Sequence, residues 1–598
     1  MKTDLPRWDM SVVYPGLDSP EYERDLRSFV RALDELEGLF DEAQIDRTDT
    51  PLNPDLAAGI LERILPPYNA LNDQAWTLGA YVYAFVSVDS RDEFAQARLS
   101  ELERHTVRLS KLHTRLTAWA GSQDVDALLE RSEQARQHAY WLQRARVIAE
   151  HMMSPAEEAL AAEMRLTGSS AWNKLYSNLT SQIQTTVEIR GERHTLTMSM
   201  LRNLATDADR EVRRTAYEAE LRAWEQHAMP IASALNAIKG ETNLLMRKRG
   251  WDSPLHASLF QNAIDEATLN AMLEAAYESF PDFRRYLHAK ARLLGVERCA
   301  WYDLFAPVGK ETRTWSFDEA AQFIIEQFAT YSQKLSDFAR RAFEERWIDA
   351  PPMPGKRDGA FCMRVRRDES RILTNYKPVF NGVGTLAHEL GHAYHNLCLA
   401  ERTYLQRMTP ATLAETASIF CNTIIDQAAL RDADRDEQIA ILEASLQGVC
   451  QVVVDITSRY LFEKEVFERR AERELSAREL CEIMRNAQLQ TYGDGLDENA
   501  LHPYMWAAKP HYYGGLFYNY PYMFGLLFGL GLYARYLDDP DGFRARYDDL
   551  LSRTGMADAP TLAAEFGFDL RTPAFWRSAL DTVRENINRF EALAQGAS

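Results

Sequence analysis

The chain has 598 residues, of which 46% are hydrophobic and 26% are charged. This composition is typical of a folded globular protein and excludes extended disorder and fibrous repeats. The formal net charge of −20 opposes binding to nucleic acid and to anionic membrane surfaces, so we expect neither as a partner. The six cysteines contain no Cys-x-x-Cys pair and no basic, apolar leader opens the chain, which together predict a cytoplasmic protein.

Helix signals recur along most of the chain. Ser19-Pro20 is a helix cap followed by proline, and Ser154–Glu157 is a capping box. The apolar residues of Asp265–Ala276 repeat at the spacing of an amphipathic helix. Thr409-Pro410 repeats the cap-and-proline signal. The apolar run Tyr522–Ala534 predicts a buried helix, because it is shorter than the roughly 20 residues that span a membrane.

Strand signals are confined to two short stretches. Thr186–Ile189 and His194–Leu196 flank a turn and predict a hairpin, which marks a boundary near Ile189–Ser199. Ala360–Val365 and Ile372–Tyr376 predict a second ribbon. The fold is therefore expected to be mostly α-helical with small β ribbons. The arginines between Arg364 and Arg371 are expected to form the solvated edge of the second ribbon.

The most specific motif is His388-Glu389-Leu390-Gly391-His392, which has the form His-Glu-x-x-His. Residues four apart lie one above the other on a helix, so His388 and His392 can bind one metal ion. Glu389 lies beside them, where it can accept a proton from a water activated by the metal. A solvated helix face would more often carry Lys, Glu or Arg than two stacked histidines. The motif therefore predicts a catalytic zinc ion.

A catalytic zinc usually has three protein ligands, and three positions compete for the third. The metzincin spacing fails, because Cys398 stands where its third histidine is required. Glu401 follows His392 too closely for a second helix to return across the first. Glu415 follows after a loop and stands among small and apolar residues, where an unpaired carboxylate would be costly to bury. We favour Glu415 over the alternative that it is an exposed glutamate in a first helical turn.

A tyrosine-rich block follows near the C-terminus, from His511 to Tyr522, with Gly514 and Gly515 inside it. Phenol and imidazole groups are hydrogen-bond donors suited to a tetrahedral oxyanion. Taken by itself, the block fits a packed aromatic belt equally well.

These stretches together resemble the oligoendopeptidase F family of zinc peptidases, relatives of thimet oligopeptidase. The resemblance covers most of the chain and rests on blocks that include the Gly391 form of the zinc motif. These blocks are Pro6–Pro15, Ser154–Tyr176, Arg249–Ser253, Gly355–Cys362, Asn381–His395 and Phe517–Tyr522.

The resemblance implies a multi-helical ellipsoid with a deep substrate channel and one zinc ion at its floor. It implies an N-terminal helical region over 1–190, with a small helical domain at about 115–185, and a zinc peptidase domain over 200–598. The expected activity is cleavage of internal bonds in short unfolded peptides by a monomer or small homo-oligomer. The strand Gly359–Cys362 is expected to pair with the extended substrate.

The resemblance also implies roles for the site residues. His388, His392 and Glu415 are the implied zinc ligands, with Glu389 as general base. Tyr520 is the implied oxyanion donor, and His511 is implied to contact the same intermediate. Which of Tyr513, Tyr518 and Tyr522 contacts substrate stays open. Asn422 is a departure, because relatives usually carry a glutamate seven residues after the ligand glutamate.

Two alternative functions are consistent with these residues. A zinc carboxypeptidase or peptidyl-dipeptidase of similar helical fold shares the motif and the spacing of the third ligand. A helical scaffold that binds peptides without zinc or cleavage is the other alternative, although the intact His388, Glu389, His392 and Glu415 argue against it.

Overall fold

Cap residues begin several helices where the sequence predicts them. In this computed structural model, which describes residues 5–309 and 313–596, Ser19 caps α1 (Pro20–Glu42), and Ser154 and Glu157 form the capping box of α7 (Pro155–Thr167). The predicted cap at Thr409 is wrong. Pro410 occupies the N-cap position of α16 (Ala411–Ala414), and among the described residues no side chain caps that helix.

The chain divides into two compact units, and each is interrupted by segments of the other. The first unit comprises Met1–Met152, Thr314–Ile425 and Asp538–Phe566. Besides α1, α16 and the first part of α17 (Thr416–Asp432), it contains α2 (Pro54–Val88), α3 (Glu93–Gly121), α4 (Val125–Arg131), α5 (Glu133–Gln137), α6 (Ala139–Glu150), α13 (Phe317–Tyr331), α14 (Gln333–Glu344), β3 (Ile348–Asp349), β4 (Phe361–Arg366), β5 (Glu369–Leu373), α15 (Phe380–Cys398), the 3-10 turn η3 (Leu405–Arg407), α24 (Pro540–Ser552) and α25 (Ala559–Glu565).

The second unit comprises Met153–Arg313, Asp426–Leu537 and Gly567–Ser598. Besides α7 it contains α8 (Ser169–Gln182), β1 (Gln184–Ile189), β2 (Glu192–Thr197), α9 (Met198–Asn203), η1 (Leu204–Thr206), α10 (Arg210–Lys248), α11 (Pro254–Gln261), α12 (Glu266–Leu294), η2 (Trp301–Asp303), α18 (Arg435–Cys450), the π-helical turn η4 (Gln451–Asp455), α19 (Ile456–Arg470), α20 (Ala477–Tyr492), η5 (Gly493–Gly495), η6 (Glu498–Ala500), α21 (Met505–Ala508), α22 (His511–Gly514), most of α23 (Tyr520–Asp538) and α26 (Pro573–Gln595). This division cuts the chain at positions other than the expected boundary near residue 190, and the expected domain limits stay a prediction.

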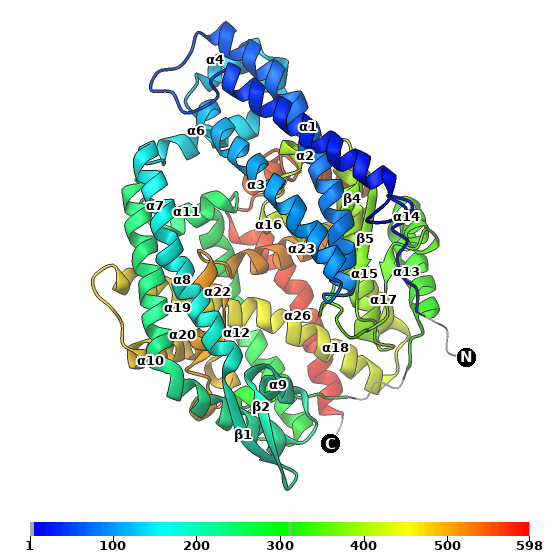
Figure 1. Cartoon of the computed structure of the whole chain (residues 1–598). Helices are drawn as coiled ribbons and strands as arrows, with labels where there is room; N and C mark the ends of the chain where they lie inside the picture. The colour runs from blue at the N-terminus through cyan, green and yellow to red at the C-terminus, as the bar shows by residue number, and fades with distance from the viewer. Residues whose placement is uncertain (1–4, 310–312, 597–598) are drawn as a thin grey trace. The chain divides into compact units, whose positions relative to one another are not determined.

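Both predicted β ribbons are confirmed. β1 and β2 pair as an antiparallel hairpin in the second unit (Figure 1). In the first unit the order is β3-β5-β4, with β4 antiparallel to β5 and the short β3 parallel to it. β4 therefore lies at an edge of this sheet, and both β4 and β5 pack against α15 (Figure 1).

The predicted solvated arginine edge is wrong for two of its residues. The side chain of Arg371 is fully buried and its guanidinium donates to the carbonyl of Asp9, 3.0 Å away. The side chain of Arg364 is only 10% exposed. Both arginines are covered because other parts of the first unit pack over the ribbon, which the local pattern of the ribbon does not encode.

The predicted buried helix near the C-terminus is confirmed as α23, in which Phe524, Leu527 and Phe528 are fully buried. Within the described residues, one helical run, Arg435–Arg470, is long and apolar enough to cross a membrane. Most of its apolar window is buried inside the protein, as in a core helix, so the run is weak evidence for a membrane span.

Candidate active site

The two motif histidines lie on one face of α15, one turn apart. The opposite face of the helix is anchored in the core of the first unit, where Leu386, Leu390 and Ala393 are buried. The histidine side chains remain partly accessible, with 30% of His388 and 24% of His392 exposed. The helix therefore presents both imidazoles to solvent from a rigid support.

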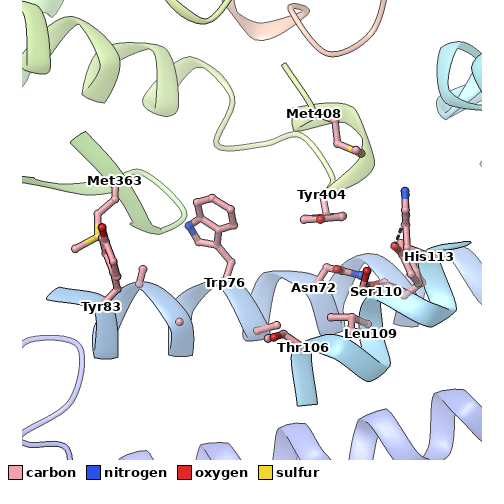
Figure 2. A pocket seen from close by; sticks show the side chains of 14 residues that line it. Asn72, Trp76, Tyr83, Thr106, Leu109, Ser110, His113, Met363, Tyr404 and Met408 are labelled. Carbon is pink, nitrogen blue, oxygen red and sulfur yellow. Dashed lines mark hydrogen bonds between the residues drawn. The ribbon is translucent and has the colours of Figure 1, made fainter. Parts of the chain in front are cut away.

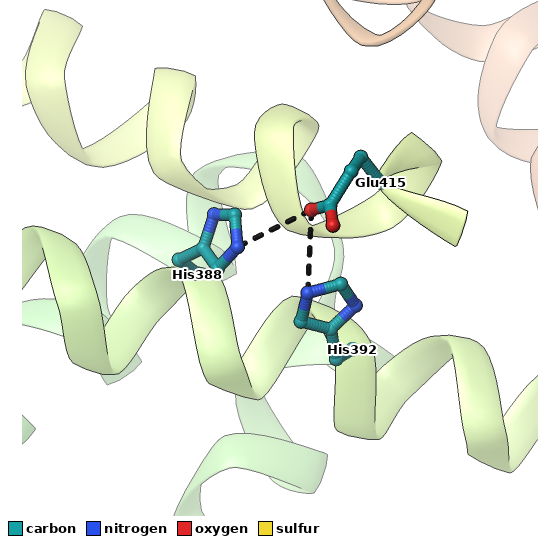
Figure 3. Close-up of side chains that lie close together, drawn as sticks. All are labelled: His388, His392 and Glu415. Carbon is teal, nitrogen blue, oxygen red and sulfur yellow. Dashed lines mark ion pairs between the residues drawn. The ribbon is translucent and has the colours of Figure 1, made fainter. Parts of the chain in front are cut away.

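Glu415 lies opposite the two histidines, at the junction of α16 and α17. Its Oε2 atom is 3.3 Å from Nε2 of His388 and 3.3 Å from Nε2 of His392 (Figure 3). The three ligand atoms lie within 4.8 Å of one another, and within the described ranges no other such group of His, Cys, Asp and Glu side chains occurs. The structure thus brings together the three residues that we predicted from the sequence as metal ligands.

The spacing of these atoms fits a metal better than a hydrogen-bonded ion pair. Charged N–H···O hydrogen bonds are about 2.7–2.9 Å long. Ligand atoms about 2.0–2.1 Å from a tetrahedral zinc lie about 3.3–3.4 Å apart. The observed 3.3 Å from Glu415 to both imidazoles matches the second spacing. A donor set of two histidines and one glutamate is also one that catalytic zinc uses.

The charges of the three side chains are coupled. Burial raises the pKa of Glu415, but the adjacent His388 and His392 outweigh burial and hold it far below its ordinary value. Burial lowers the pKa of His392, but the contact with Glu415 outweighs burial and raises it. The carboxylate is therefore ionised at neutral pH and ready to bind a cation.

Ser418 orients the Glu415 carboxylate, a role that the sequence reading missed. Its hydroxyl donates to Oε2 of Glu415 at 2.7 Å, and the side chain of Ser418 is fully buried. The available signal was local, because a serine three residues after Glu415 lies above it on a continuing helix. Such outer partners fix the geometry of a ligand and commonly affect metal affinity.

Glu389 has the environment expected of a general base beside these ligands. Glu389 is only 6% exposed, and its Oε2 atom is buried without a hydrogen-bond partner among the described residues. Burial raises the pKa of Glu389, against the opposing effect of His392 and His388. An unpartnered buried carboxylate oxygen is costly, so its presence here indicates a ligand or reactant that it serves.

Asn422, the departure from the family pattern, also lies close to α15. Its Oδ1 atom is 3.1 Å from the position that a Cβ on Gly384 would occupy. Gly384 is one turn before His388 on α15. Asn422 therefore packs against the helix that carries the histidines and lies outside the ligand cluster.

The tyrosine-rich block belongs to the second unit. His511 begins α22, its ring stacks on Tyr518 with centroids 4.7 Å apart, and its buried Nδ1 has no hydrogen-bond partner among the described residues. Burial, together with the charges of Arg459 and Lys509, lowers the pKa of His511. The imidazole is therefore neutral at neutral pH.

The three tyrosines of Tyr518–Tyr522 differ sharply in exposure. Tyr520 is fully buried and its hydroxyl lies 3.1 Å from Oγ of Ser258 on α11, while burial raises its pKa. Tyr518 is 45% exposed and Tyr522 is 42% exposed, and the Tyr522 hydroxyl donates to that of Tyr518 at 2.9 Å. Of these three tyrosines, Tyr518 and Tyr522 are therefore the exposed residues, and the role predicted for Tyr520 stays a prediction.

A buried ion pair holds the backbone just before these tyrosines. Phe517 has a φ of +44°, a left-handed conformation that is strained for a phenylalanine. Its N–H donates to Oε1 of Glu463 at 3.2 Å, and Lys239 donates to the same oxygen at 2.6 Å. Strain that surrounding contacts maintain in this way is commonly found at functional sites.

Comparison with known families agrees with this geometry. The family model described as Peptidase family M3 matches residues 203–582, and the one described as Oligopeptidase F matches residues 120–184. The chain belongs to peptidase family M3. It is therefore a metallo-oligopeptidase, and the cluster of His388, His392 and Glu415 lies within the matched range.

Curated relatives and solved structures extend the family match to almost the whole chain. Group B oligopeptidase PepB of Streptococcus agalactiae is 24% identical over 98% of this chain and 97% of its own. The chromosomal oligoendopeptidase F of Lactococcus lactis is 26% identical over 68% of each chain. The fold matches that of oligoendopeptidase F from Enterococcus faecium, with a TM-score of 0.69 at 19% identity over 96% of this chain and 98% of that one. A crystal structure from Chlamydophila abortus matches with a TM-score of 0.84 at 20% identity over 98% of each chain.

Proposed function

We propose that this member of peptidase family M3 is a zinc-dependent endopeptidase that hydrolyses internal bonds of short unfolded peptides, with Glu389 as general base. The observation that carries the proposal is the buried, unpartnered Oε2 atom of Glu389 next to the histidines of the ligand cluster. Within the described part of the chain this oxygen has no hydrogen-bond partner, and a proton acceptor in hydrolysis needs a free oxygen.

His388, His392 and Glu415 would hold the zinc ion, with Ser418 fixing the carboxylate. Zinc bound there would supply a Lewis acid that acidifies water and polarises the scissile carbonyl. Glu389 would take a proton from the attacking water and return it to the leaving amine. Its raised pKa favours the first of these transfers, because a carboxylate of higher pKa is a stronger base.

His511 and the tyrosines of Tyr518–Tyr522 are the proposed donors to the oxyanion. The resemblance to the oligoendopeptidase F family favours Tyr520, whereas the greater exposure of the residue favours Tyr518. The Tyr518 hydroxyl accepts a hydrogen bond from Tyr522, which leaves its own proton available to a ligand. A neutral His511 can donate from one ring nitrogen.

The cellular compartment is a proposal of the same kind. All six cysteines are free, and each is at least partly buried. Unpaired thiols are typical of a reducing compartment, which supports the expected cytoplasmic location.

The test is hydrolysis of a quenched peptide library by zinc-loaded, chelated and zinc-restored protein, with products identified by mass spectrometry. Internal fragments that appear only with zinc are the expected result. Release of single residues or dipeptides from the C-terminus alone would favour the carboxypeptidase or peptidyl-dipeptidase alternative. Peptide binding without any zinc-dependent cleavage would favour the scaffold.

A further inference from the structure

Apart from the ligand cluster, the first unit contains a pocket of about 550 Å³ between α2, α3, β4 and the segment that follows α15 (Figure 2). This volume lies within the range of about 300–1,000 Å³ that is usual for ligand sites. The side chains that define its character are Trp76, Tyr83, His113, Met363, Tyr404 and Met408.

The lining of this pocket is uncharged and largely apolar. None of the residues that line it is Asp, Glu, Lys or Arg, although the protein carries a net charge of −20. Burial lowers the pKa of His113, so its ring is also neutral at neutral pH. Such a lining desolvates a neutral apolar group at little cost and excludes charged ones.

Two large apolar side chains at the pocket are exposed to water. Trp76 is 47% exposed and Met408 is 48% exposed. The Trp76 ring is nevertheless fixed, because its Nε1 donates to the carbonyl of Arg364 at 2.7 Å and the Arg364 guanidinium lies 5.5 Å from the ring centroid. Fixed aromatic surface that faces water is typical of a surface prepared for a ligand.

β4 connects this pocket to the metal-ligand helix. Cys362 points toward α15, where its Sγ is 3.9 Å from Nδ2 of Asn396, one turn beyond His392. Its neighbours lie on the opposite face, because side chains alternate along a strand. The Phe361 ring is 5.7 Å from that of Tyr83, and Met363 lines the pocket. One face of β4 therefore faces the helix of the histidines and the other faces the pocket.

A second wall of the pocket belongs to the connection between the metal ligands. Tyr404 and Met408 lie between His392 and Glu415 in the chain (Figure 2). This connection is tied to the N-terminal helices, since Leu405 N donates to Oδ1 of Asn69 at 3.1 Å. One wall of the pocket is thus formed by the segment that joins the two ligand-bearing elements in the chain.

We propose that this pocket binds a bulky apolar side chain of the peptide substrate, with aromatic side chains preferred, and the proposal rests on the endopeptidase function proposed above. β4 is an edge strand, and its Arg364 and Val365 carbonyls are occupied by Trp76 and Thr77. A peptide added along Phe361–Met363 presents alternate side chains to opposite faces. Those on the face of Phe361 and Met363 enter the pocket.

The test compares two matched substitutions on α3. Ser110 is exposed and lines the pocket, so Ser110→Phe fills it, whereas Ser100→Phe places the same ring at an exposed position of α3 outside the lining. Trp76→Ala tests the pocket in the opposite way, because it removes a large lining side chain and leaves the pocket empty. The substrates are pairs of peptides that share one sequence and differ at a single position, which is Phe in one peptide and Ala in the other. Each position of the sequence is tested in turn by its own pair.

The expected result is a preference for Phe over Ala in kcat/KM at one position or at alternate positions. Ser110→Phe and Trp76→Ala reduce that preference about tenfold to a hundredfold, the range for burial of one large apolar side chain. Ser100→Phe retains the parental preference. Zinc content and circular dichroism of each variant verify that the ligand cluster and the fold are intact.

A binding measurement separates this proposal from the catalytic one. Calorimetry with the full chain carrying Glu389→Gln compares the affinities of Phe and Ala peptides, with and without Ser110→Phe. A Phe preference in binding that Ser110→Phe abolishes supports the pocket proposal, whether or not the parental protein cleaves peptides. Absence of any peptide cleavage by the parental protein would refute the proposed function instead. Equal binding of both series, or the same behaviour of Ser110→Phe and Ser100→Phe, overturns the pocket proposal.

Discussion

Gly391 and Ala417 bring the two ligand-bearing segments into backbone contact. A Cβ on Gly391 would lie 2.6 Å from the carbonyl oxygen of Ala417 and 2.6 Å from Cα of Ser418. The glycine of the zinc motif is therefore required by the close approach of α15 and α17, and not by an unusual φ. The same approach places Glu415 opposite His388 and His392.

Gly391→Ala should consequently disturb both stability and metal binding. The added methyl group meets backbone atoms that cannot rotate away, and such overpacking typically costs about 1–3 kcal/mol of unfolding free energy. Because Glu415 and Ser418 must shift, we expect zinc affinity to fall about tenfold to a hundredfold. Urea unfolding and zinc titration measure the two effects. Gly448→Ala on α18 is the control, because among the described residues no atom outside the local helix backbone lies within 4 Å of a Cβ there. It should be neutral or stabilising by up to about 1 kcal/mol.

Removal of any one ligand should release most of the zinc. His388→Ala, His392→Ala and Glu415→Ala each leave only two protein donors, and a two-donor site binds zinc poorly. Metal analysis after dialysis measures the loss. Glu401→Ala provides the comparison, because Glu401 is exposed and lies outside the cluster. Full zinc content and activity in Glu415→Ala would show that another residue is the third ligand.

Glu389→Gln should separate metal binding from chemistry. The amide keeps the shape of the side chain but cannot accept the proton, so we expect normal zinc content and a fall of about 10²–10⁴ in kcat. Single-turnover kinetics on a quenched peptide give the rate. Activity near the parental value, in protein free of contaminating peptidase, would exclude Glu389 as the base.

The three tyrosines provide a test of the oxyanion donor. Loss of a preorganised donor typically costs about 10²–10³ in kcat with little change in KM. Because Tyr518 is exposed and Tyr520 is fully buried, we expect this loss in Tyr518→Phe. Tyr520→Phe should keep near-parental kcat and lose about 1 kcal/mol of stability, because its hydroxyl is paired with Ser258. The opposite result, a large loss of kcat in Tyr520→Phe alone, would support the role that the resemblance to oligoendopeptidase F implies for Tyr520.

Lys509 should make the stability of the protein depend on pH. Burial, with the charges of Arg459 and Arg202, lowers its pKa from 10.5 to about 7. Between pH 7 and 10.5 the unfolded chain binds a proton that the folded chain has released, so this group makes stability rise with pH in that window. Below pH 7 the full cost of the buried charge is present.

Lys509→Met should accordingly stabilise the protein most near pH 6 and progressively less toward pH 10. Urea unfolding at pH 6, 8 and 10 gives the difference between the variant and the parent. The same substitution at the exposed Lys464 corrects for the general effect of losing a positive charge. A stability difference between Lys509→Met and the parent that is constant over this range would contradict the expectation.

Local patterns determined the parts of this protein that depend on short sequence spacing. His388 and His392 share a helix face because the α-helical period places residues four apart in line, and no distant contact is needed for that. The capping box at Ser154 and the hairpin of β1 and β2 are likewise local. Glu415 was chosen by spacing and by elimination, and the structure places it opposite the histidines. Its role as the third metal ligand stays a prediction.

Tertiary structure alone decided the features that join distant segments. Three contacts join residues that are remote in the sequence. They are the close approach of Gly391 to Ala417, the hydrogen bond from buried Arg371 to the Asp9 carbonyl, and the hydrogen bond between the hydroxyls of Tyr520 and Ser258. The pocket beside β4 is built from four separate segments. Helical periodicity specifies which face of a segment is apolar, but packing selects the neighbour that covers it. Side chains of the same type therefore end as core, ligand or exposed binding surface according to contacts that no local pattern contains.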